Sequence, residues 1–226
     1  MKIVYEDQWF LVVAKTNQES VQPDLTKTVS LVELLRSNYP LIAPINRVDK
    51  VVGGLVLFGK NPEAQNKGRE VFTQNNTSKK YLAITSNKLQ NDSGVLEHYI
   101  KRDGRYKKSF VKDEKWSDAK LSRLRYRLLD QSDTLYCWDI ELLTGRFHQI
   151  RSQLAHMGCP IRGDRKYGYQ RYNKGGGIHL HSYYLSFHNP FVNKQITIFD
   201  YPLDDAIWDL FIKNIVRKKE VESEKV

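Results

Sequence analysis

The sequence has little cysteine and no long hydrophobic run, and both absences exclude whole classes of protein. Cys137 and Cys159 are the only cysteines among 226 residues, and a pair 22 positions apart does not form a disulfide framework. The apolar run at residues 9–14 is far shorter than the ~20 residues that a membrane helix needs. Residues 1–7 turn acidic where a signal peptide would be apolar. We therefore expect a cytoplasmic protein that is not associated with a membrane.

Negative charge is also scarce. The sequence has 36 Lys and Arg against 26 Asp and Glu, which gives a formal net charge of +10. The basic residues gather at 79–80, 101–108, 120–127 and 162–171, and aromatic residues are interleaved with them at 105–110 and 167–172. Cations interleaved with aromatic rings are typical of surfaces that bind nucleic acid through phosphate contacts and base stacking. A solvated strand face whose Lys and Arg promote solubility fits the charge equally well.

Short strands dominate the hydrophobic pattern. The predicted strands cover residues 2–5, 9–14, 54–59, 79–86, 94–100, 122–130, 135–142, 178–187 and 194–199. They follow one another like antiparallel hairpins instead of alternating with helices. This order predicts an α+β fold with a mainly antiparallel mixed sheet and flanking helices. We expect one domain over residues 1–216 and a charged, mobile tail over residues 217–226.

Caps and periodicity predict four helices. They cover residues 30–35, 61–72, 146–157 and 204–216. Ser30 with Glu33 has the capping-box spacing, and Asn61 before Pro62 supplies an N-cap and a first-turn proline. In the third helix the apolar residues recur every three or four positions from Phe147 to Met157.

Several common catalytic patterns are missing. The sequence contains no phosphate-binding G-x-x-x-x-G-K-[ST] loop, no G-x-S-x-G elbow, no C-x-x-C and no H-E-x-x-H. His156 stands three residues before Cys159, and His179 two residues before His181, but such spacings are as frequent among ordinary polar residues. We therefore predict neither a metal site nor a cofactor.

Two clusters carry the strongest chemical signal. The first places Asp49 between the cations Arg47 and Lys50, directly before an apolar strand, and its spacing alone favours an exposed charge cluster over a held carboxylate. The second places Arg146, His148, Gln149 and Arg151 in the first two turns of the third predicted helix. Free N–H groups and the helix dipole favour anions there, although a solvated amphipathic face would look the same.

Together the two clusters resemble the RluA-type pseudouridine synthases. The family pattern T-G-R-x-H-Q-I-R-x-x-L-x-x-x-G-x-P-I-x-G-D-x-x-Y-G is met at every fixed position from Thr144 to Gly168. The first motif, H-R-L-D-x-x-T-S-G-L, is similar to residues 46–55. Residues 79–83 look like the K-x-Y-x-A element, and residues 180–190 are similar to the closing stretch, so the resemblance spans about residues 3–199.

The resemblance implies an RNA pseudouridine synthase without a cofactor. We expect it to act on structured rRNA or tRNA and to flip the target uridine out of the RNA. We also expect a monomer with no obligatory protein partner. By position, Asp49 is implied as the catalytic aspartate, serving as nucleophile or base, Arg151 as its ion-pair partner, and Tyr81 as the residue near the uracil ring. The implied RNA-binding residues are Arg47, Lys80, Arg146, His148 and Gln149.

The first motif departs from the family pattern at four positions. Asn46, Val48, Val52 and Gly53 stand where the family has His, Leu, Thr and Ser. The late His-Pro is Asn189-Pro190, and Lys15 is not followed by P-x-G. These changes affect loop shape more than the acid itself. They leave one alternative open, an RNA-binding or ribosome-associated protein that keeps the fold but has lost catalysis. A metal-dependent nuclease is a third hypothesis.

Overall fold

The computed structural model describes residues 1–24, 28–73, 77–203 and 205–223. The chain divides into two compact units, which are described separately. Unit 1 comprises Met1–Lys80 and His181–Asp200, and unit 2 comprises Tyr81–Leu180 and Tyr201–Val226. Strands β5 and β10 each contain residues of both units.

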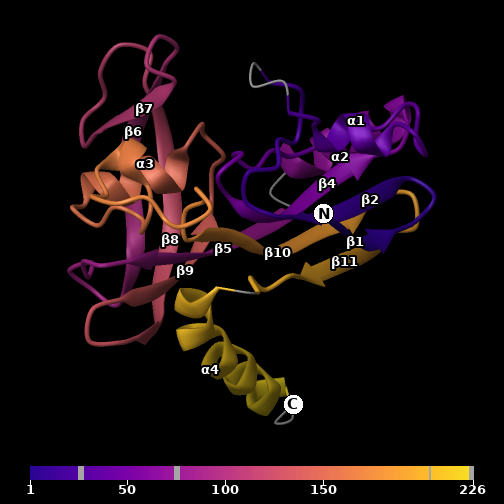
Figure 1. The fold of residues 1–226 in the computed structure, drawn as a ribbon. Coiled ribbons are helices and arrows are strands. Elements are labelled where there is room, and N and C mark those ends of the chain that lie inside the picture. Colours follow the sequence, from indigo (N-terminus) through magenta and orange to yellow (C-terminus); the bar gives the residue numbers. More distant parts are fainter. Residues whose placement is uncertain (25–27, 74–76, 204, 224–226) are drawn as a thin grey trace. The chain divides into compact units, whose positions relative to one another are not determined.

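Unit 1 is built on strands that belong to one sheet (Figure 1). Its elements are β1 (Lys2–Glu6), β2 (Phe10–Lys15), α1 (Leu31–Leu35), β3 (Ala43–Pro44), β4 (Gly53–Gly59), α2 (Pro62–Thr73), β10 (Leu180–Asn189) and β11 (Lys194–Phe199). The strand order is β1-β2-β4-β10, with β11 paired to β10 and β3 paired to β4. The pairs are antiparallel except β4 with β10, which is parallel.

The core of unit 1 forms where two wholly buried strands meet a helix. Every residue of β2 and β4 is buried, because both strands are almost continuously apolar. Phe10, Leu57 and Phe187 of the sheet belong to the same buried cluster as Ala64 and Val71 of α2. The capping box of α1 is formed as predicted, with Glu33 N–H donating to Ser30 Oγ and Glu33 Oε2 accepting from Ser30 N–H.

Unit 2 has a second run of strands and the two helices of the C-terminal half of the chain. Its elements are β5 (Thr77–Thr85), β6 (Ser93–Asp103), β7 (Lys108–Lys112), β8 (Lys120–Gln131), β9 (Tyr136–Leu142), α3 (Gln149–His156), the 3-10 turn Arg165–Tyr167 and α4 (Ala206–Ser223). The strand order is β5-β9-β8-β6-β7. Trp138 and Ile140 of β9, Leu124 of β8 and Leu154 of α3 are completely buried.

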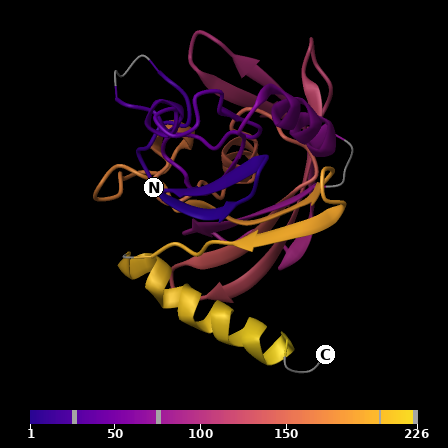
Figure 2. The ribbon, with the colours of Figure 1, turned by 90° about the vertical axis from the view of Figure 1, so that its right-hand side faces the viewer.

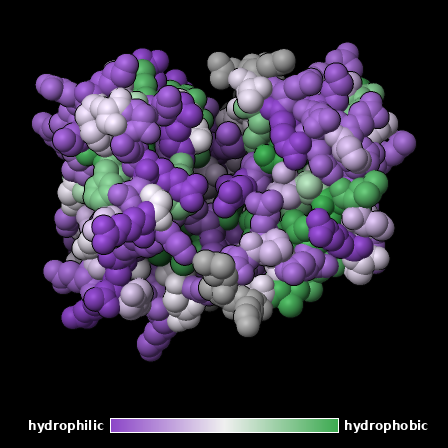
Figure 3. Space-filling model, turned by 90° about the horizontal axis from the view of Figure 1, so that it is seen from above, coloured by the Kyte–Doolittle hydropathy of each residue, from purple (hydrophilic) through white to green (hydrophobic). Residues whose placement is uncertain are grey.

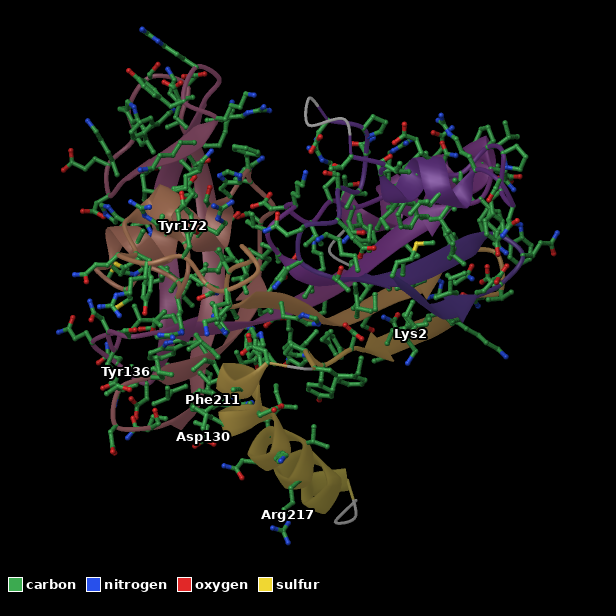
Figure 4. All side chains as sticks on the ribbon, in the orientation of Figure 1. Lys2, Asp130, Tyr136, Tyr172, Phe211 and Arg217 are labelled. Atoms are coloured by element: carbon green, nitrogen blue, oxygen red, sulfur yellow. The ribbon has the colours of Figure 1, made fainter. Side chains whose placement is uncertain are left out.

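Helix α4 packs against β8 within unit 2 (Figure 2). Trp208, Phe211 and Ile215 are buried along one side of the helix. Asn214 Nδ2 donates to Asp130 Oδ2 (3.0 Å), and the labelled Phe211 and Asp130 mark this junction in Figure 4. None of the helices described is long and apolar enough to cross a membrane.

The α+β fold is confirmed, and three element predictions are corrected. Helix α3 begins at Gln149 instead of residue 146, because His148 has the left-handed φ of 53° and cannot continue a right-handed helix. Helix α4 reaches Ser223, so it includes most of the expected tail, whose residues 224–226 lie outside the described residues. Strands β3 and β7 were not predicted, and both are short.

Candidate active site

Asp49 lies in the loop between β3 and β4 of unit 1. Its carbonyl accepts a hydrogen bond from Val52 N–H (3.0 Å), which closes a tight turn. Val48 is only 7% exposed and anchors the loop in the core, whereas Arg47 is exposed and Asp49 is half-buried. The loop therefore holds its acid on a fixed backbone and directs the neighbouring guanidinium outward.

The buried ammonium of Lys15 fastens this loop. Lys15 is 2% exposed, and Nζ donates to the carbonyls of Thr16, Lys50 (3.3 Å) and Val52. Burial lowers the pKa of Lys15 to about 8, and the carboxylates of Glu19 and Asp49 partly offset that effect. Lys15 thus forms hydrogen bonds with the carbonyls of two residues of the Asp49 turn, Lys50 and Val52. Sequence reasoning gave it no role, although a lysine that ends an apolar strand was a signal.

Asn46 stands where the resembling family has histidine, and it has a structural task here. Its Oδ1 accepts a hydrogen bond from the Leu57 N–H of β4 (2.7 Å). A second backbone bond from Ile45 N–H to the Leu57 carbonyl (2.8 Å) ties the same two segments. The side chain of Asn46 therefore docks the start of the Asp49 loop on β4, so this departure preserves the support of the loop.

The glycine pair after the loop allows β4 to lie against β10. Gly54 has φ +104°, and a Cβ added there would lie 2.2 Å from the Ser182 carbonyl oxygen. A Cβ on Gly53 would lie 2.8 Å from His181 Nδ1. Gly54 therefore combines a positive φ with a close approach to the Ser182 backbone, both of which favour glycine. Gly53 leaves room for the His181 ring.

In unit 2 Arg151 is held by a carboxylate that sequence reasoning did not single out. Arg151 Nε donates to Asp164 Oδ2 (2.7 Å), and Nη2 donates to Asp164 Oδ1 (2.9 Å). Arg151 is 5% exposed and Asp164 is 2% exposed. This bidentate geometry fixes the guanidinium plane. Asp164 occupies a fixed position of the motif from Thr144 to Gly168, and that position was the sequence signal that could have identified it as a site residue. Asp49 belongs to unit 1, and its pairing with Arg151 stays a prediction.

Tyr167 lies beside this ion pair and connects it to His148. The Arg151 guanidinium lies over the Tyr167 ring, 5.0 Å from its centroid. Tyr167 Oη accepts from Ser109 N–H (2.8 Å) and lies 2.9 Å from His148 Nδ1. Burial raises the pKa of Tyr167 to about 12, so its hydroxyl stays protonated at neutral pH beside the Arg151 guanidinium and the His148 ring.

The turn before α3 replaces the first helical turn that the sequence predicted. Gln149 Oε1 accepts from Thr144 Oγ1 (2.9 Å) and Arg146 N–H (3.0 Å), and Gln149 Nε2 donates to the Arg123 carbonyl (3.0 Å). Gln149 is 3% exposed, so its amide shapes the turn from inside. Arg146 is exposed and His148 half-buried outside the helix. Direct RNA contact by these three residues stays a prediction.

Strand β5 carries the remaining two predicted residues. Lys80 belongs to unit 1, and its Nζ lies over the Tyr184 ring, 5.4 Å from the centroid. Tyr81 belongs to unit 2 and is 7% exposed. The structure therefore collects Arg47, Asp49 and Lys80 in unit 1, and Tyr81 and the motif residues from Arg146 to Arg151 in unit 2.

One of the four basic clusters is a paired strand face. Arg123, Arg125 and Arg127 are exposed at alternating positions of β8. They pair with carboxylates on the neighbouring strands β6 and β9: Arg123 with Glu97, Arg125 with Glu141 (2.7 Å) and Arg127 with Asp139 (3.8 Å). The charge of these three arginines is therefore largely compensated across the sheet, as the solvated-face interpretation expects.

Three possible metal ligands lie together in unit 2, although no spacing in the sequence pointed to them. Nitrogen atoms of His98 and His156 and an oxygen of Asp113 lie within 4.8 Å of one another. Gln153 Nε2 donates to His98 Nδ1 (2.9 Å), which leaves the proton of the neutral ring on Nε2. Nε2 is the nitrogen that faces Asp113, at 3.7 Å, and would have to bind the metal. The arrangement therefore favours contacts from the Nε2 atoms of the two histidines to the Asp113 carboxylate over a bound metal ion.

The two histidines of the pair that the sequence spacing suggested each lie beside a carboxylate. His179 Nε2 lies 3.1 Å from Asp205, within unit 2, and His181 Nε2 lies 2.8 Å from Asp200, within unit 1. Each ring therefore faces its own carboxylate.

Comparison with known proteins identifies the family. The model of the RNA pseudouridylate synthase family matches residues 10–156, about two thirds of the chain. The chain belongs to the RNA pseudouridylate synthase family. The match includes the Asp49 loop, β5 and α3, and it confirms the RluA-type resemblance. The protein is therefore an RNA pseudouridine synthase.

Relatives support this assignment. The chain is 29% identical over 227 residues to the uncharacterized RNA pseudouridine synthase YlyB of Bacillus subtilis, covering 95% of this chain and 73% of that protein. It is 30% identical to the ribosomal large subunit pseudouridine synthase C of Rickettsia typhi, covering 87% and 66%. It is 26% identical to the tRNA pseudouridine synthase C of Vibrio parahaemolyticus, covering 94% of each.

Solved structures agree on the fold. The human RNA pseudouridylate synthase domain containing 1 superposes with a TM-score of 0.73 at 21% identity, covering 94% of this chain and 93% of that chain. The human domain containing 4 gives a TM-score of 0.74 at 18% identity, covering 94% and 92%.

Proposed function

We propose that this synthase isomerises specific uridines in structured ribosomal or transfer RNA, with Asp49 acting on the sugar. The observation that carries the proposal is the Asp49 turn, whose backbone is held by the buried Lys15 ammonium. A fixed backbone with a partly exposed carboxylate is what a nucleophile or base requires. The printed names of two relatives, one acting on the large ribosomal subunit and one on tRNA, support these RNA classes.

The reaction needs no external reagent. The glycosidic bond from ring nitrogen to sugar C1′ breaks, the uracil turns, and ring carbon C5 bonds to C1′. The hydrogen on C5 then leaves to solvent as a proton, and the ring nitrogen released from C1′ takes up a proton, so that product and substrate are isomers. Asp49 either attacks C1′ and later leaves, or removes a proton from the sugar so that the base departs. Either route begins with an ionised Asp49, which a positive Arg151 would favour and orient.

Access to the uridine requires that the base leave the RNA stack. Extrusion costs a few kcal/mol, and we assign the exposed Arg47 to the vacated space, because no described residue forms an ion pair with it. Tyr81 would stack on the extruded uracil. Lys80, Arg146 and His148 would contact RNA, and Gln149 would act by holding the turn that carries Arg146 and His148.

Release of label from RNA tritiated at uridine C5 tests the proposal. Ribosomal and transfer RNA transcripts are supplied separately, with excess enzyme, in the presence and in the absence of a chelator. Label released together with pseudouridine from either class supports the proposal. Binding to both classes without any release would favour the catalytically inactive RNA-binding protein, and chain cleavage that the chelator abolishes would favour a nuclease.

A further inference from the structure

A stack of three side chains stands at the surface of unit 2, beside the β6–β7 hairpin. The Arg102 guanidinium lies over the Phe147 ring, 4.5 Å from its centroid. The His148 ring stacks on Phe147 with 3.8 Å between centroids and 20° between planes. Phe147 occupies the variable position within the otherwise fixed motif T-G-R-x-H, so the family pattern does not specify this stack.

The fold holds the stack rigidly. Ser109 of β7, which is paired with Arg102 of β6, donates its hydroxyl to the Phe147 carbonyl. The left-handed backbone of His148 turns its ring back against Phe147, and Tyr167 Oη, 2.9 Å from Nδ1, holds that ring in place. Each layer of the stack is therefore anchored by the hairpin or by Tyr167.

The top layer is open and its charge is uncompensated. Arg102 is exposed, and among the described residues no carboxylate forms an ion pair with it. The equally exposed Arg125 of β8 is paired with Glu141. Lys108, whose Nζ lies 5.0 Å from the Tyr167 ring centroid, adds a second cation that lacks an ion pair among the described residues. In the view from above, hydrophilic residues predominate on the surface, with smaller groups of hydrophobic residues among them (Figure 3).

We propose that Arg102, backed by Phe147 and His148, is a platform on which an unpaired nucleobase of the RNA substrate stacks. The inference rests on the proposed action on RNA and extends it to a binding site. Guanidinium planes stack on bases, and single-stranded RNA bases are commonly read in this way. Phe147 holds the flexible arginine before RNA arrives, which reduces the entropy lost on binding. Lys108 can then meet the phosphate of the same nucleotide.

Equilibrium binding of a short single-stranded RNA containing a fluorescent purine analogue tests the platform. Arg102→Lys keeps the charge and removes the plane, and Phe147→Leu keeps an apolar side chain and removes the ring. Both should weaken binding about tenfold and restore the fluorescence that stacking quenches in the wild-type protein. Arg125→Ala, which alters an exposed arginine of the same sheet, should change affinity less than about twofold.

The outcomes separate a platform from general charge. Wild-type affinity and quenching in Arg102→Lys, or losses equal to those of Arg125→Ala, would overturn the proposal. Thermal unfolding of each variant shows whether a loss of RNA affinity results from a destabilised fold. Arg102→Lys changes an exposed side chain and leaves the core intact. Because binding is measured without turnover, a wild-type protein that binds with quenching but releases no C5 label would refute the proposed function and leave the platform standing.

Discussion

At the scale of single residues, the buried Lys15 predicts a pH response of the Asp49 turn. Its pKa is lowered to about 8, so between about pH 8 and the unfolded value of 10.5 the folded lysine is neutral while the unfolded lysine still binds a proton. Its contribution to folding stability therefore rises with pH through this window. In the same window the amine loses one of the three N–H donors that face the carbonyls of Thr16, Lys50 and Val52.

We therefore expect the single-turnover rate to fall as the pH rises above about 8, without a matching loss of thermal stability. Lys15→Met, which fits the apolar surroundings but lacks donors, should be slow at all pH values and should not show this alkaline decrease. Rate profiles of both proteins on the same RNA, measured together with melting temperatures, check this. An identical alkaline decrease in Lys15→Met would assign it to another group.

The bidentate pair of Arg151 with Asp164 gives a second prediction at this scale. Lysine cannot reproduce both bonds to Asp164, and one lost bond to a charged group costs about 1.5–3 kcal/mol. We expect Arg151→Lys to lower the free energy of unfolding by about 2 kcal/mol. The single-turnover rate should fall at least about tenfold, equivalent to ~1.4 kcal/mol of barrier.

Arg125→Lys is the matched control, because its bond to Glu141 is exposed and such pairs contribute only about 0–1 kcal/mol. It should be nearly silent in both assays. A near-normal rate for Arg151→Lys would reduce Arg151 to a general positive charge without an orienting role.

At the scale of elements, the parallel contact of β4 with β10 depends on Gly54. Alanine there would have to adopt a positive φ and place its Cβ against the Ser182 backbone. We expect Gly54→Ala to lower the free energy of unfolding by about 2–4 kcal/mol, combining left-handed strain with displacement of the backbone.

Gly104→Ala is the control, since a Cβ at that position meets nothing within 4 Å. Urea titrations of both variants decide the matter, and equal midpoints would show that β10 moves away at little cost.

Elements with local signals could be predicted, and those shaped by distant contacts could not. Ser30 and Glu33 fix the start of α1 within four residues of sequence, and the alternation along β8 marks its two faces. The start of α3 was wrong because the left-handed conformation of His148 accompanies contacts with Phe147 and Tyr167 that no periodicity encodes.

The same distinction holds within the site. The two motifs single out Asp49 and Arg151 as candidates, whereas the support from Lys15 and the choice of Asp164 as partner of Arg151 depend on which chain segments meet. Many carboxylates were available in the sequence. Composition likewise could not show which arginines, such as those of β8, are compensated across the sheet.

At the scale of the whole molecule, the net charge of +10 predicts RNA binding that depends strongly on salt. With about five phosphate contacts, affinity should fall roughly 100-fold or more between 50 and 200 mM salt. Because the β8 arginines are already paired, Arg125→Ala should leave the slope of log affinity against log salt unchanged. A flat salt response of the wild-type protein would contradict an electrostatic mode of binding.

The central claim is that Asp49 performs the isomerisation, and Asp49→Asn tests it most directly. The amide keeps the size of the side chain and removes its negative charge, and the exposed Asp133→Asn serves as control for the loss of one charge. Single-turnover release of C5 label is measured beside RNA affinity for both variants and the wild-type protein. We predict that Asp49→Asn binds RNA within a few-fold of wild type and releases no label, while Asp133→Asn does both normally. Substantial turnover by Asp49→Asn would contradict the account.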